Sequence, residues 1–523
     1  MKTLNELLDY AAQNSRPGIG LLTETENLPY TELKNRILTI ASNFERNGIK
    51  KGDRIAIIHR NSPVFIEAYF ALSRLGAIAV PINYMIHNPE ELSYMLNDCG
   101  AVGIVTQKEF IKGLREAMKF SEKIEFLWIS DEDKSTGLEK ELPFSNLLQG
   151  HPEAFDPVSV SEEDVAVILY TSGTTGKPKG VMLTHKNLIT NTEGGIARLN
   201  LFPHDSSLAI LPMFHTLAWT ANVLVSLRLG ARLAIAPTIT PPKTWLNLMA
   251  KSKTTLFLAV PQIYSLLAKS SKGLKGFILR HWYFRKVRMA VSGAAPLNSA
   301  TCQEFERAFK VKILEGYGLT ETSPVITINS PEYPKAGSVG KPIEGVEVKI
   351  VDDEERILKA GEEGEICARG HCVMKGYYNL PEETKEAFTK DGWLKTGDIG
   401  ILDEEGCLFI RDRKKDMIII KGLKVFSAQV EAVLAENQEI LESAVIGVPD
   451  EHGDEIIKAF VVLKPGSKED KSSLMKYCRE KFDSYKRPRD IEIVESLPKN
   501  SLQKILKRTL REMEIKKRAA SVG

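Results

Sequence analysis

Short apolar runs alternate with longer segments of helical periodicity through the first part of the chain. Apolar positions recur at helical spacing over Tyr30–Asn47 and Ser62–Leu75, and the short apolar runs Arg54–Ile58 and Ile78–Pro81 follow these two segments. Helices of this length between short buried strands are typical of βαβ units around a mainly parallel sheet. The alternation continues with predicted strands at Ser207–Leu211, Arg232–Ala236, Thr255–Ala259, Val287–Ser292 and Val311–Leu314.

The pattern changes twice in the second half of the chain. From about Gly337 to Ile410, short alternating runs between Gly and Asp turns predict a β-rich subdomain. Further on, the predicted order is a helix, two strands and a helix, at Ser427–Asn437, Ser443–Val448, Lys458–Leu463 and Lys471–Phe482. We therefore predict an α/β protein with two domains. Residues 1–414 form a large domain of mainly parallel sheets plus the β-rich subdomain, and residues 415–523 form a small α+β domain.

Composition limits the class of protein. The chain has 523 residues, 43% of them hydrophobic and 26% charged, and its net charge of +2 argues against nucleic acid as a partner. Six scattered cysteines without a C-x-x-C pair argue against a disulfide framework or zinc site. Met1–Arg16 lacks the apolar core of a signal peptide, and no apolar run is long enough to span a bilayer. We expect a cytoplasmic protein, with contact at the inner face of the membrane left open.

The segment Tyr170–Gly180 carries the strongest chemical signal. It reads Tyr-Thr-Ser-Gly-Thr-Thr-Gly-Lys-Pro-Lys-Gly and combines four hydroxyls, three glycines and two lysines. Glycine lets backbone N–H groups approach an anion, while hydroxyls and lysines add donors and charge, so the loop suits a polyphosphate. It is not a Walker A loop. Apolar runs at Val165–Tyr170 and Val181–Thr184 predict that the loop joins two strands.

The loop resembles the AMP-binding signature of the adenylate-forming superfamily, which includes acyl-CoA synthetases, aryl-CoA ligases, luciferases and peptide-synthetase adenylation domains. Other segments match this family in the same order between about Leu28 and Arg508: Leu211–His215, Ser292–Pro296, Gly316–Glu321, Gly392–Asp398, Arg413–Gly422, Tyr485–Pro488 and Leu497–Lys504. The resemblance implies an enzyme that uses ATP and Mg²⁺ to convert a carboxylic acid to acyl-AMP and then transfers the acyl group to coenzyme A.

The resemblance also implies roles for individual residues. Glu321 and the Thr171 hydroxyl would hold Mg²⁺, Thr320 would bind the α-phosphate, Gly293–Ala295 would flank adenine and Tyr317 would stack on it. Asp398 and Arg413 would bind the ribose. The implied ATP contacts are Thr171, Ser172, Gly173, Thr174, Thr175, Gly176, Lys177, Lys179, Gly293, Ala294, Ala295, Gly316, Tyr317, Gly318, Asp398 and Arg413.

Lys504 occupies the position of the family's catalytic lysine, which stabilises charge during adenylation. The family has Gly directly before this lysine, whereas this chain has Gln503. A helix that begins near Asn500 or Ser501 is predicted from a stripe at helical spacing, formed by Leu502, Ile505, Leu506, Thr509, Leu510 and Met513. The alternative to the catalytic role is that Lys504 is a solvated residue of this helix.

Four further residues are implied to act in thioester formation. Lys415 matches the hinge about which the C-terminal domain rotates between the two half-reactions, with a plain linker as the alternative. Gly422 would line the pantetheine tunnel, and His215 would gate it. Trp219 matches the tryptophan gate of long-chain acyl-CoA synthetases, although a packed core aromatic residue would have the same sequence context. The stretch Lys471–Gly523 has a net charge of +8, which suits either solvent or the phosphates of coenzyme A.

The first functional hypothesis is a synthetase for medium- or long-chain fatty acids. An aryl- or alicyclic-carboxylate ligase, a fatty acyl-AMP ligase that serves a carrier protein, and a catalytically weak nucleotide-binding homologue stay open. The expected partners are the carboxylate, ATP and coenzyme A. Arg280–Arg288 interleaves basic and aromatic residues, and we read it as a helix end that leads into a strand, with an interfacial membrane patch as the alternative. A homodimer is also left open.

Overall fold

The computed structural model describes residues 1–121, 123–132, 138, 140–152, 155–156, 158–171, 177–420, 423–449, 455–499 and 505–522, with side chains up to residue 517. The chain forms two compact units. The N-terminal unit comprises Met1–Val348 and Ala368–Leu394, and the C-terminal unit comprises Lys349–Cys367 and Lys395–Gly523. The predicted domain boundary at Lys415 is not tested by this division and stays a prediction.

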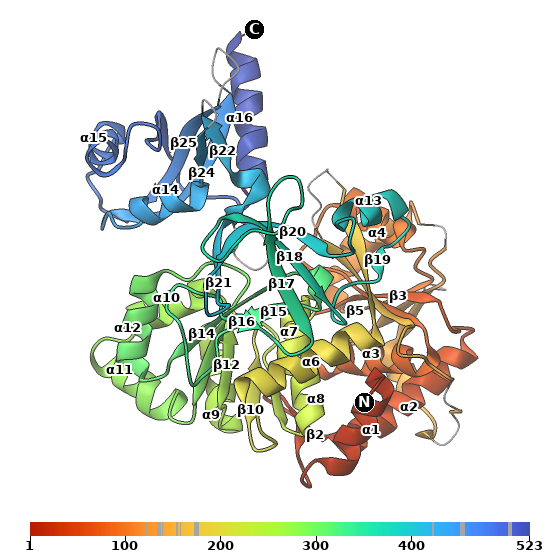
Figure 1. The fold of residues 1–523 in the computed structure, drawn as a ribbon. Coiled ribbons are helices and arrows are strands. Elements are labelled where there is room, and N and C mark those ends of the chain that lie inside the picture. The colour runs from red at the N-terminus through yellow and green to blue at the C-terminus, as the bar shows by residue number, and fades with distance from the viewer. Residues whose placement is uncertain are drawn as a thin grey trace. The chain divides into compact units, whose positions relative to one another are not determined.

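The N-terminal unit contains a nine-stranded and an eight-stranded sheet (Figure 1). The nine-stranded sheet has the order β16 (Lys341–Pro342), β15 (Val325–Ile328), β14 (Ile313–Gly318), β13 (Met289–Ser292), β12 (Leu256–Ala259), β10 (Ser206–Ala209), β11 (Arg232–Ile235), β1 (Gly20–Leu22) and β2 (Asn27–Pro29). The eight-stranded sheet has the order β19 (Gly376–Tyr377), β9 (Lys179–Thr184), β8 (Val165–Thr171), β4 (Ile78–Pro81), β3 (Arg54–Ile58), β5 (Gly103–Thr106), β6 (Phe126–Ile129) and β7 (Glu141–Pro143).

The interior strands of both sheets are parallel, and antiparallel pairs lie toward the edges. In the eight-stranded sheet the pairs from β7 to β8 are parallel, and β8–β9 and β9–β19 are antiparallel. In the nine-stranded sheet the antiparallel pairs are β1–β2, β14–β15 and β15–β16. The mainly parallel α/β fold predicted from the sequence is therefore confirmed.

The helices of the N-terminal unit follow the strands as the periodicity predicts. The helical segments are α1 (Leu4–Asn14), α2 (Tyr30–Arg46), α3 (Pro63–Leu75), α4 (Pro89–Asp98), η1 (Lys108–Phe110), α5 (Ile111–Met118), η2 (Phe144–Leu148), α6 (His185–Leu199), α7 (Thr216–Ala218), η4 (Trp219–Leu224), α8 (Val225–Leu229), α9 (Pro242–Ser252), α10 (Pro261–Lys269), α11 (Gly273–Ile278), η5 (Leu279–Tyr283), α12 (Ser299–Phe309), η6 (Thr320–Thr322) and α13 (Pro381–Ala387). The segments η4 and η5 have π-helical geometry.

Helices α3 and α6 form the interior of the N-terminal unit. Ser62 caps α3 by accepting a hydrogen bond from the Phe65 N–H, Pro63 stands in its first turn, and Gly76 ends it in the left-handed conformation. Every α3 residue from Phe65 to Leu75 is buried. Helix α6 contacts β9 of one sheet and β15 of the other, so it joins the two sheets across the core.

The C-terminal unit contains most of a four-stranded sheet and a small α+β fold. The four strands are β17 (Val346–Val351), β18 (Gly364–Gly370), β20 (Leu394–Leu402) and β21 (Leu408–Arg413). The remaining elements are η7 (Lys414–Asp416), β22 (Ile418–Ile420), β23 (Leu423–Val425), α14 (Ser427–Leu434), β24 (Ile440–Pro449), β25 (Glu455–Leu463), α15 (Lys471–Lys481), β26 (Asp490–Ile493) and α16 (Lys507–Val522). The β-rich segment and the α+β fold predicted from the sequence are both present.

Two further findings bear on the sequence predictions. All six cysteines are free thiols. In the described part of the chain, no helix is both long enough and apolar enough to cross a bilayer.

Candidate active site

A β-hairpin presents the predicted phosphate loop. Strands β8 and β9 pair antiparallel with Thr171 opposite Lys179, as the apolar flanks of the loop predict. Gly180 follows directly, and a Cβ at this position would lie 2.8 Å from Ile168 Cγ2, so the close packing of the hairpin favours glycine here. Ser172, Gly173, Thr174, Thr175 and Gly176 lie outside the described residues.

Helix α4 holds both ends of this loop. The Tyr94 hydroxyl donates a hydrogen bond of 3.2 Å to the Pro178 carbonyl oxygen, and the Lys177 ammonium lies 5.0 Å from the centre of the Tyr94 ring. At the other end, the Tyr170 hydroxyl donates to an Asp98 carboxylate oxygen at 2.6 Å. The sequence analysis missed these contacts, because the helix lies some 80 positions before the loop and carries no motif of its own.

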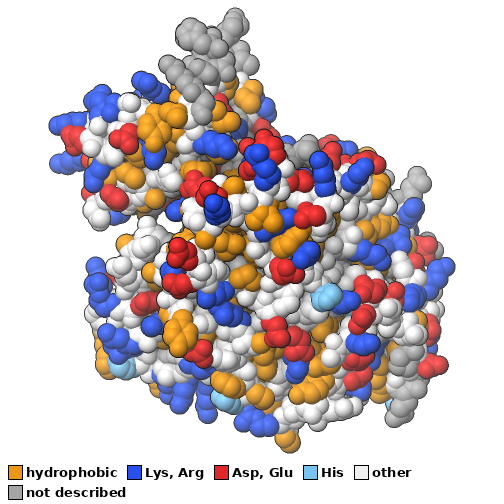
Figure 2. Space-filling model, in the orientation of Figure 1, with side chains coloured by type: hydrophobic (Ala, Val, Ile, Leu, Met, Phe, Trp, Pro, Cys, Tyr) orange, Lys and Arg blue, Asp and Glu red, His pale blue; other side chains and the backbone are white. Residues whose placement is uncertain are grey.

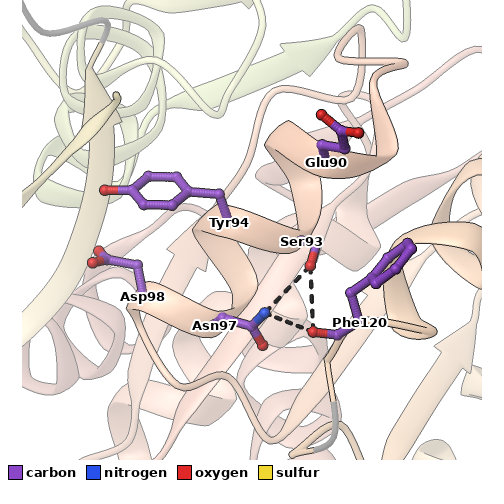
Figure 3. A pocket seen from close by; sticks show the side chains of 6 residues that line it. All are labelled: Glu90, Ser93, Tyr94, Asn97, Asp98 and Phe120. Carbon is purple, nitrogen blue, oxygen red and sulfur yellow. Dashed lines mark hydrogen bonds between the residues drawn. The ribbon is translucent and has the colours of Figure 1, made fainter. Parts of the chain in front are cut away.

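Tyr94 and Asp98 also line a surface pocket of about 540 Å³ (Figure 3). Its other lining residues are Glu90, Ser93, Asn97 and Phe120. The Asn97 side chain donates a hydrogen bond of 2.7 Å to the Phe120 carbonyl oxygen. This hydrogen bond and the hydrogen bonds of the Ser93 hydroxyl to Phe120 and Asn97 hold together the side of the pocket that these three residues form (Figure 3). The pocket therefore adjoins the residues that hold the loop.

Tyr377 connects the second strand of the hairpin to the predicted magnesium ligand. Its hydroxyl donates a hydrogen bond of 3.0 Å to Glu321 Oε1, and the Lys179 ammonium lies 5.1 Å from the centre of its ring. Pairing of β19 with β9 places Tyr377 opposite Val181. Burial and the neighbouring Glu321 carboxylate raise the pKa of the Tyr377 phenol, so it stays a donor at neutral pH. The sequence analysis missed Tyr377, since no motif includes it.

The candidate adenine residues follow two neighbouring parallel strands. Ser292 at the end of β13 is in register with Glu315 in β14, which brings Gly293–Ala295 beside Gly316–Gly318. At such a carboxyl edge, parallel sheets commonly bind nucleotides. Ala294 adopts a positive φ of 69°, and a Cβ at Gly318 would lie 1.8 Å from the Pro324 carbonyl oxygen. Only glycine fits at this second position.

Thr320 and Glu321 lie in the short helix η6 that follows this edge. The segment is held by the Thr322 hydroxyl, which donates to the Pro324 carbonyl at 2.6 Å, and by the Met374 N–H, which donates to the Glu321 carbonyl at 2.8 Å. The Glu321 carboxylate and the Thr171 hydroxyl are hard oxygen donors, the chemistry that Mg²⁺ prefers.

His215 directly precedes the short helix α7, and Trp219 is the first residue of η4. His215 is partly buried, and burial lowers the pKa of its imidazole to about 4, so the ring is neutral at pH 7. Trp219 is 3% exposed, and its ring centre is 4.0 Å from that of Tyr69 on α3. Among the described residues the Trp219 Nε1 and Tyr69 Oη atoms have no hydrogen-bond partner of standard geometry, although the two side chains interact with each other. Trp219 therefore has the packing of a core aromatic residue and also leaves a buried polar atom without a standard hydrogen bond.

Asp398 and Arg413 form the candidate ribose site in the C-terminal unit. The two residues are register partners on the antiparallel strands β20 and β21, and Arg413 Nε lies 3.0 Å from Asp398 Oδ1. Asp398 is 3% exposed, while Arg413 is half-buried. The Asp398 carboxylate can accept a hydrogen bond from one hydroxyl group, and the Arg413 guanidinium can donate a hydrogen bond to another.

The predicted hinge follows β21 and is linked to the C-terminal helices by polar contacts. Burial, with a smaller effect of Arg413, lowers the pKa of Lys415. Asp412, just before the hinge, accepts hydrogen bonds from the Ser427 hydroxyl at 2.7 Å and from the Ala428 N–H at 3.2 Å. The Lys507 ammonium donates to the same Ser427 hydroxyl at 2.7 Å. Ser427 thus joins the strand before Lys415 to the segment that follows Lys504.

The C-terminal helix begins later than the sequence predicts. Helix α16 starts at Lys507, whereas Ile505 forms an isolated bridge with Lys499 and the Leu506 N–H donates to the Pro498 carbonyl. The prediction of a helix through Ile505 and Leu506 is therefore wrong, because these backbone groups pair with the preceding strand-like segment. Gln503, Lys504 and Gly422 lie outside the described residues.

Comparisons with known proteins identify the family. The model of the AMP-binding enzyme family matches residues 9–378, and the model of the AMP-binding enzyme C-terminal domain matches residues 429–504. A long-chain-fatty-acid–CoA ligase of Bacillus subtilis (strain 168) is 36% identical over an alignment of 547 positions, which covers 98% of this chain and 95% of that protein. The 4-coumarate–CoA ligase 1 of Arabidopsis thaliana is 35% identical over 90% of this chain and 85% of its own.

Solved structures agree with this result. The o-succinylbenzoate coenzyme A synthetase of Bacillus subtilis in complex with ATP and magnesium ion superposes with a TM-score of 0.81 at 27% identity, over 96% of this chain and 98% of that one. The chain therefore belongs to the AMP-binding enzyme family, within the adenylate-forming superfamily that its motifs resemble. By class it is an AMP-forming acid–thiol ligase, an acyl- or aryl-CoA ligase.

Proposed function

We propose that this enzyme activates a medium- or long-chain fatty acid with ATP and Mg²⁺ and transfers the acyl group to coenzyme A. The observation that carries the chemistry is the connection from Lys179, which pairs with Thr171 in the hairpin, through Tyr377 to Glu321. It gathers a cation, a hydroxyl and an oriented carboxylate at one end of a hairpin. These are the groups needed to hold a magnesium–triphosphate.

In the first half-reaction, a carboxylate oxygen of the acid attacks the α-phosphorus of ATP, and the bond to the pyrophosphate oxygen breaks. Mg²⁺ would neutralise charge on the phosphates, and Glu321 and Thr171 would hold it. Lys179 and the loop Thr171–Lys177 would bind the β- and γ-phosphates, Thr320 would donate to the α-phosphate, and Lys504 would stabilise the developing charge. Fixed donors at the site of charge development provide the main rate acceleration.

The nucleoside would be bound through its base and its ribose. Tyr317 would stack on adenine against Gly293–Ala295, and the Asp398 carboxylate would accept hydrogen bonds from the ribose hydroxyls, with Arg413 beside it.

In the second half-reaction, the coenzyme A sulfur attacks the acyl carbon, the bond from carbon to the AMP oxygen breaks, and AMP leaves. Rotation about Lys415 would withdraw Lys504 and present Gly422 at the thiol channel. A neutral His215 would let the channel open without burying a charge, which agrees with the lowered pKa of this residue.

The fatty-acid assignment rests on the length and identity of the match to the Bacillus ligase and on the apolar surroundings of Trp219. The ring of Trp219 packs against Phe65, Tyr69 and Phe70 with centroid distances of 5.6, 4.0 and 6.0 Å. An aryl carboxylate is the second candidate, supported by the coumarate ligase and by the Tyr69 hydroxyl and Trp219 indole nitrogen, which lack a standard hydrogen bond and suit a polar ring substituent.

An acid panel separates the two candidates. Coenzyme A thioesters formed from acetate, octanoate, palmitate, benzoate and coumarate would be measured by mass spectrometry, for the native enzyme and for Trp219→Ala. We expect the fatty acids to give the highest kcat/KM, and Trp219→Ala to move the optimum toward longer chains. A preference for coumarate would replace the fatty-acid assignment with the aryl one, and adenylate formation without thioester would indicate transfer to a carrier protein.

A further inference from the structure

A row of large apolar side chains faces solvent on α11 and η5. The exposed side chains are Leu274 at 76%, Phe277 at 61%, Ile278 at 44% and Trp282 at 57%. Their spacing is that of one face of a helix, at positions i, i+3, i+4 and i+8. Single exposed apolar residues are common, but four on one short helical segment mark an interaction surface. We call this surface the α11–η5 face.

The opposite side of the segment is fixed in the core. Leu279 and Phe284 are 5% and 3% exposed, and the Phe284 ring lies edge-on to Phe257 and Phe305 with centroid distances of 5.3 and 5.9 Å. Helices α10, α11 and α12 lie at one edge of the N-terminal unit (Figure 1). The segment is therefore held by its inner side, and its apolar outer side is not needed for that packing.

Positive charge surrounds the α11–η5 face. Between Asp205 and Glu304 the chain has twelve Lys and Arg residues and no Asp or Glu, although the net charge of the whole protein is only +2. Lys272, Lys275, Arg285 and Lys286 are exposed, and none of them forms an ion pair with a carboxylate in the part of the chain that the structure describes. Figure 2 shows Lys and Arg side chains along this edge of the molecule.

Trp282 joins the apolar and basic groups. The Arg285 guanidinium lies 5.3 Å from the centre of the exposed Trp282 ring, which directs the cation to the margin of the apolar row. Tryptophan at such a margin suits the boundary between headgroups and acyl chains, and basic residues around it attract anionic lipid.

We propose that the α11–η5 face docks on the surface of a bilayer that contains anionic phospholipid. The positive charge around the face favours an anionic lipid surface over a second copy of the chain. A second copy of the chain paired through the same face would bring Lys272, Lys275, Arg285 and Lys286 of each copy together without carboxylates to match them, and like charges oppose such an isologous contact. The proposal concerns a surface outside the candidate active site and does not depend on the identity of the acid.

Trp282 supplies a direct readout of docking. The protein has five tryptophans, and Trp128, Trp219, Trp245 and Trp393 are all buried. The full-length protein would be mixed with vesicles of phosphatidylcholine, with or without added phosphatidylglycerol, in which the acyl chains are brominated. We expect quenching of tryptophan fluorescence only with phosphatidylglycerol, and loss of this quenching at high salt, because about 1 M salt shortens the Debye length to about 3 Å.

Matched variants test each part of the face. Phe277→Ser should weaken vesicle binding roughly tenfold, the factor that corresponds to about 1.4 kcal/mol. The double variant Arg285→Glu and Lys286→Glu should abolish the preference for phosphatidylglycerol. Tyr333→Ser is the control, since Tyr333 is 84% exposed and lies outside the face. Thioester formation from a water-soluble acid without vesicles should be unchanged in all three variants.

Three results would overturn the proposal. The first is equal binding to neutral and anionic vesicles, the second is binding without quenching of Trp282, and the third is vesicle binding by Phe277→Ser equal to that of the native protein. Dimerisation that Phe277→Ser abolishes, in the absence of vesicle binding, would assign the face to a second copy instead. Loss of thioester formation in every variant would concern the proposed function and not the membrane surface, because that assay contains no lipid.

Discussion

Removal of the Tyr377 hydroxyl tests the geometry of the candidate site most specifically. In Tyr377→Phe the ring remains, so the Lys179 contact at 5.1 Å and the pairing of β19 with β9 are kept. The change removes only the hydrogen bond of 3.0 Å to Glu321 Oε1. A hydrogen bond to a charged group contributes about 1.5–3 kcal/mol, and the lower end applies because Tyr377 is only half-buried.

The expected loss is about 1.5 kcal/mol, which corresponds to a decrease of about tenfold in kcat/KM for ATP in the adenylation step. The measurement is pyrophosphate release with saturating acid and no coenzyme A, at several Mg²⁺ concentrations. Because Glu321 would hold Mg²⁺, the variant should also need more Mg²⁺ for half-maximal rate. Tyr377→Leu, which loses the ring as well, should be slower still.

Tyr378→Phe is the matched control, because the Tyr378 hydroxyl makes no hydrogen bond among the described residues and lies one position away. We expect this variant to retain native rates. A Tyr377→Phe enzyme with native kcat/KM and native Mg²⁺ dependence would refute the reasoning, and would mean that Glu321 is oriented by other contacts.

Three further predictions follow from the same structure. Asp398→Ala should raise the KM for ATP about tenfold or more through loss of charged hydrogen bonds to ribose, as steady-state kinetics would show. It should also lower the melting temperature, because Arg413 loses its buried ion-pair partner. Ser427→Ala removes the hydroxyl that donates a hydrogen bond of 2.7 Å to Asp412. Single-turnover assays should show the rates of the two half-reactions shifted in opposite directions by about fivefold, and rates equal to those of the native enzyme would argue against a link across the hinge. His59 and His185 are buried, and burial lowers the pKa of each imidazole to about 4, so each takes up a proton on unfolding below about pH 6.5. Each therefore removes about 1.4 kcal/mol of stability per pH unit between pH 6.5 and 4, and replacing either histidine by Gln should flatten the fall of the melting temperature over this range.

The regular elements were predictable because local pattern determines them. The run Arg54–Ile58 is the strand β3 without any shift, and α3 differs from the predicted helix only by its cap, Ser62. The start of α16 was not predictable in this way. Its apolar stripe extends through Leu506, but the Leu506 N–H bonds to Pro498, and this non-local contact prevails over helical periodicity.

The candidate site was predictable where the family has motifs and not elsewhere. Glu321 and Asp398 belong to recognisable segments, and the structure gives each a defined partner in its own unit. Tyr377 and Tyr94 act on the same loop from β19 and α4, and only the pairing of strands distant in sequence brings them there. Contacts of this kind leave no spacing rule in a single sequence.

The most direct test of the proposed chemistry follows one oxygen atom. The enzyme would convert a fatty acid with heavy-oxygen-labelled carboxylate, in the presence of ATP, Mg²⁺ and coenzyme A, and the products would be analysed by mass spectrometry. Attack of the carboxylate on the α-phosphorus and later cleavage of the acyl carbon–oxygen bond predict one labelled oxygen in AMP and none in pyrophosphate. Label in inorganic phosphate together with ADP would contradict the account, because the acid would then have been activated as an acyl phosphate.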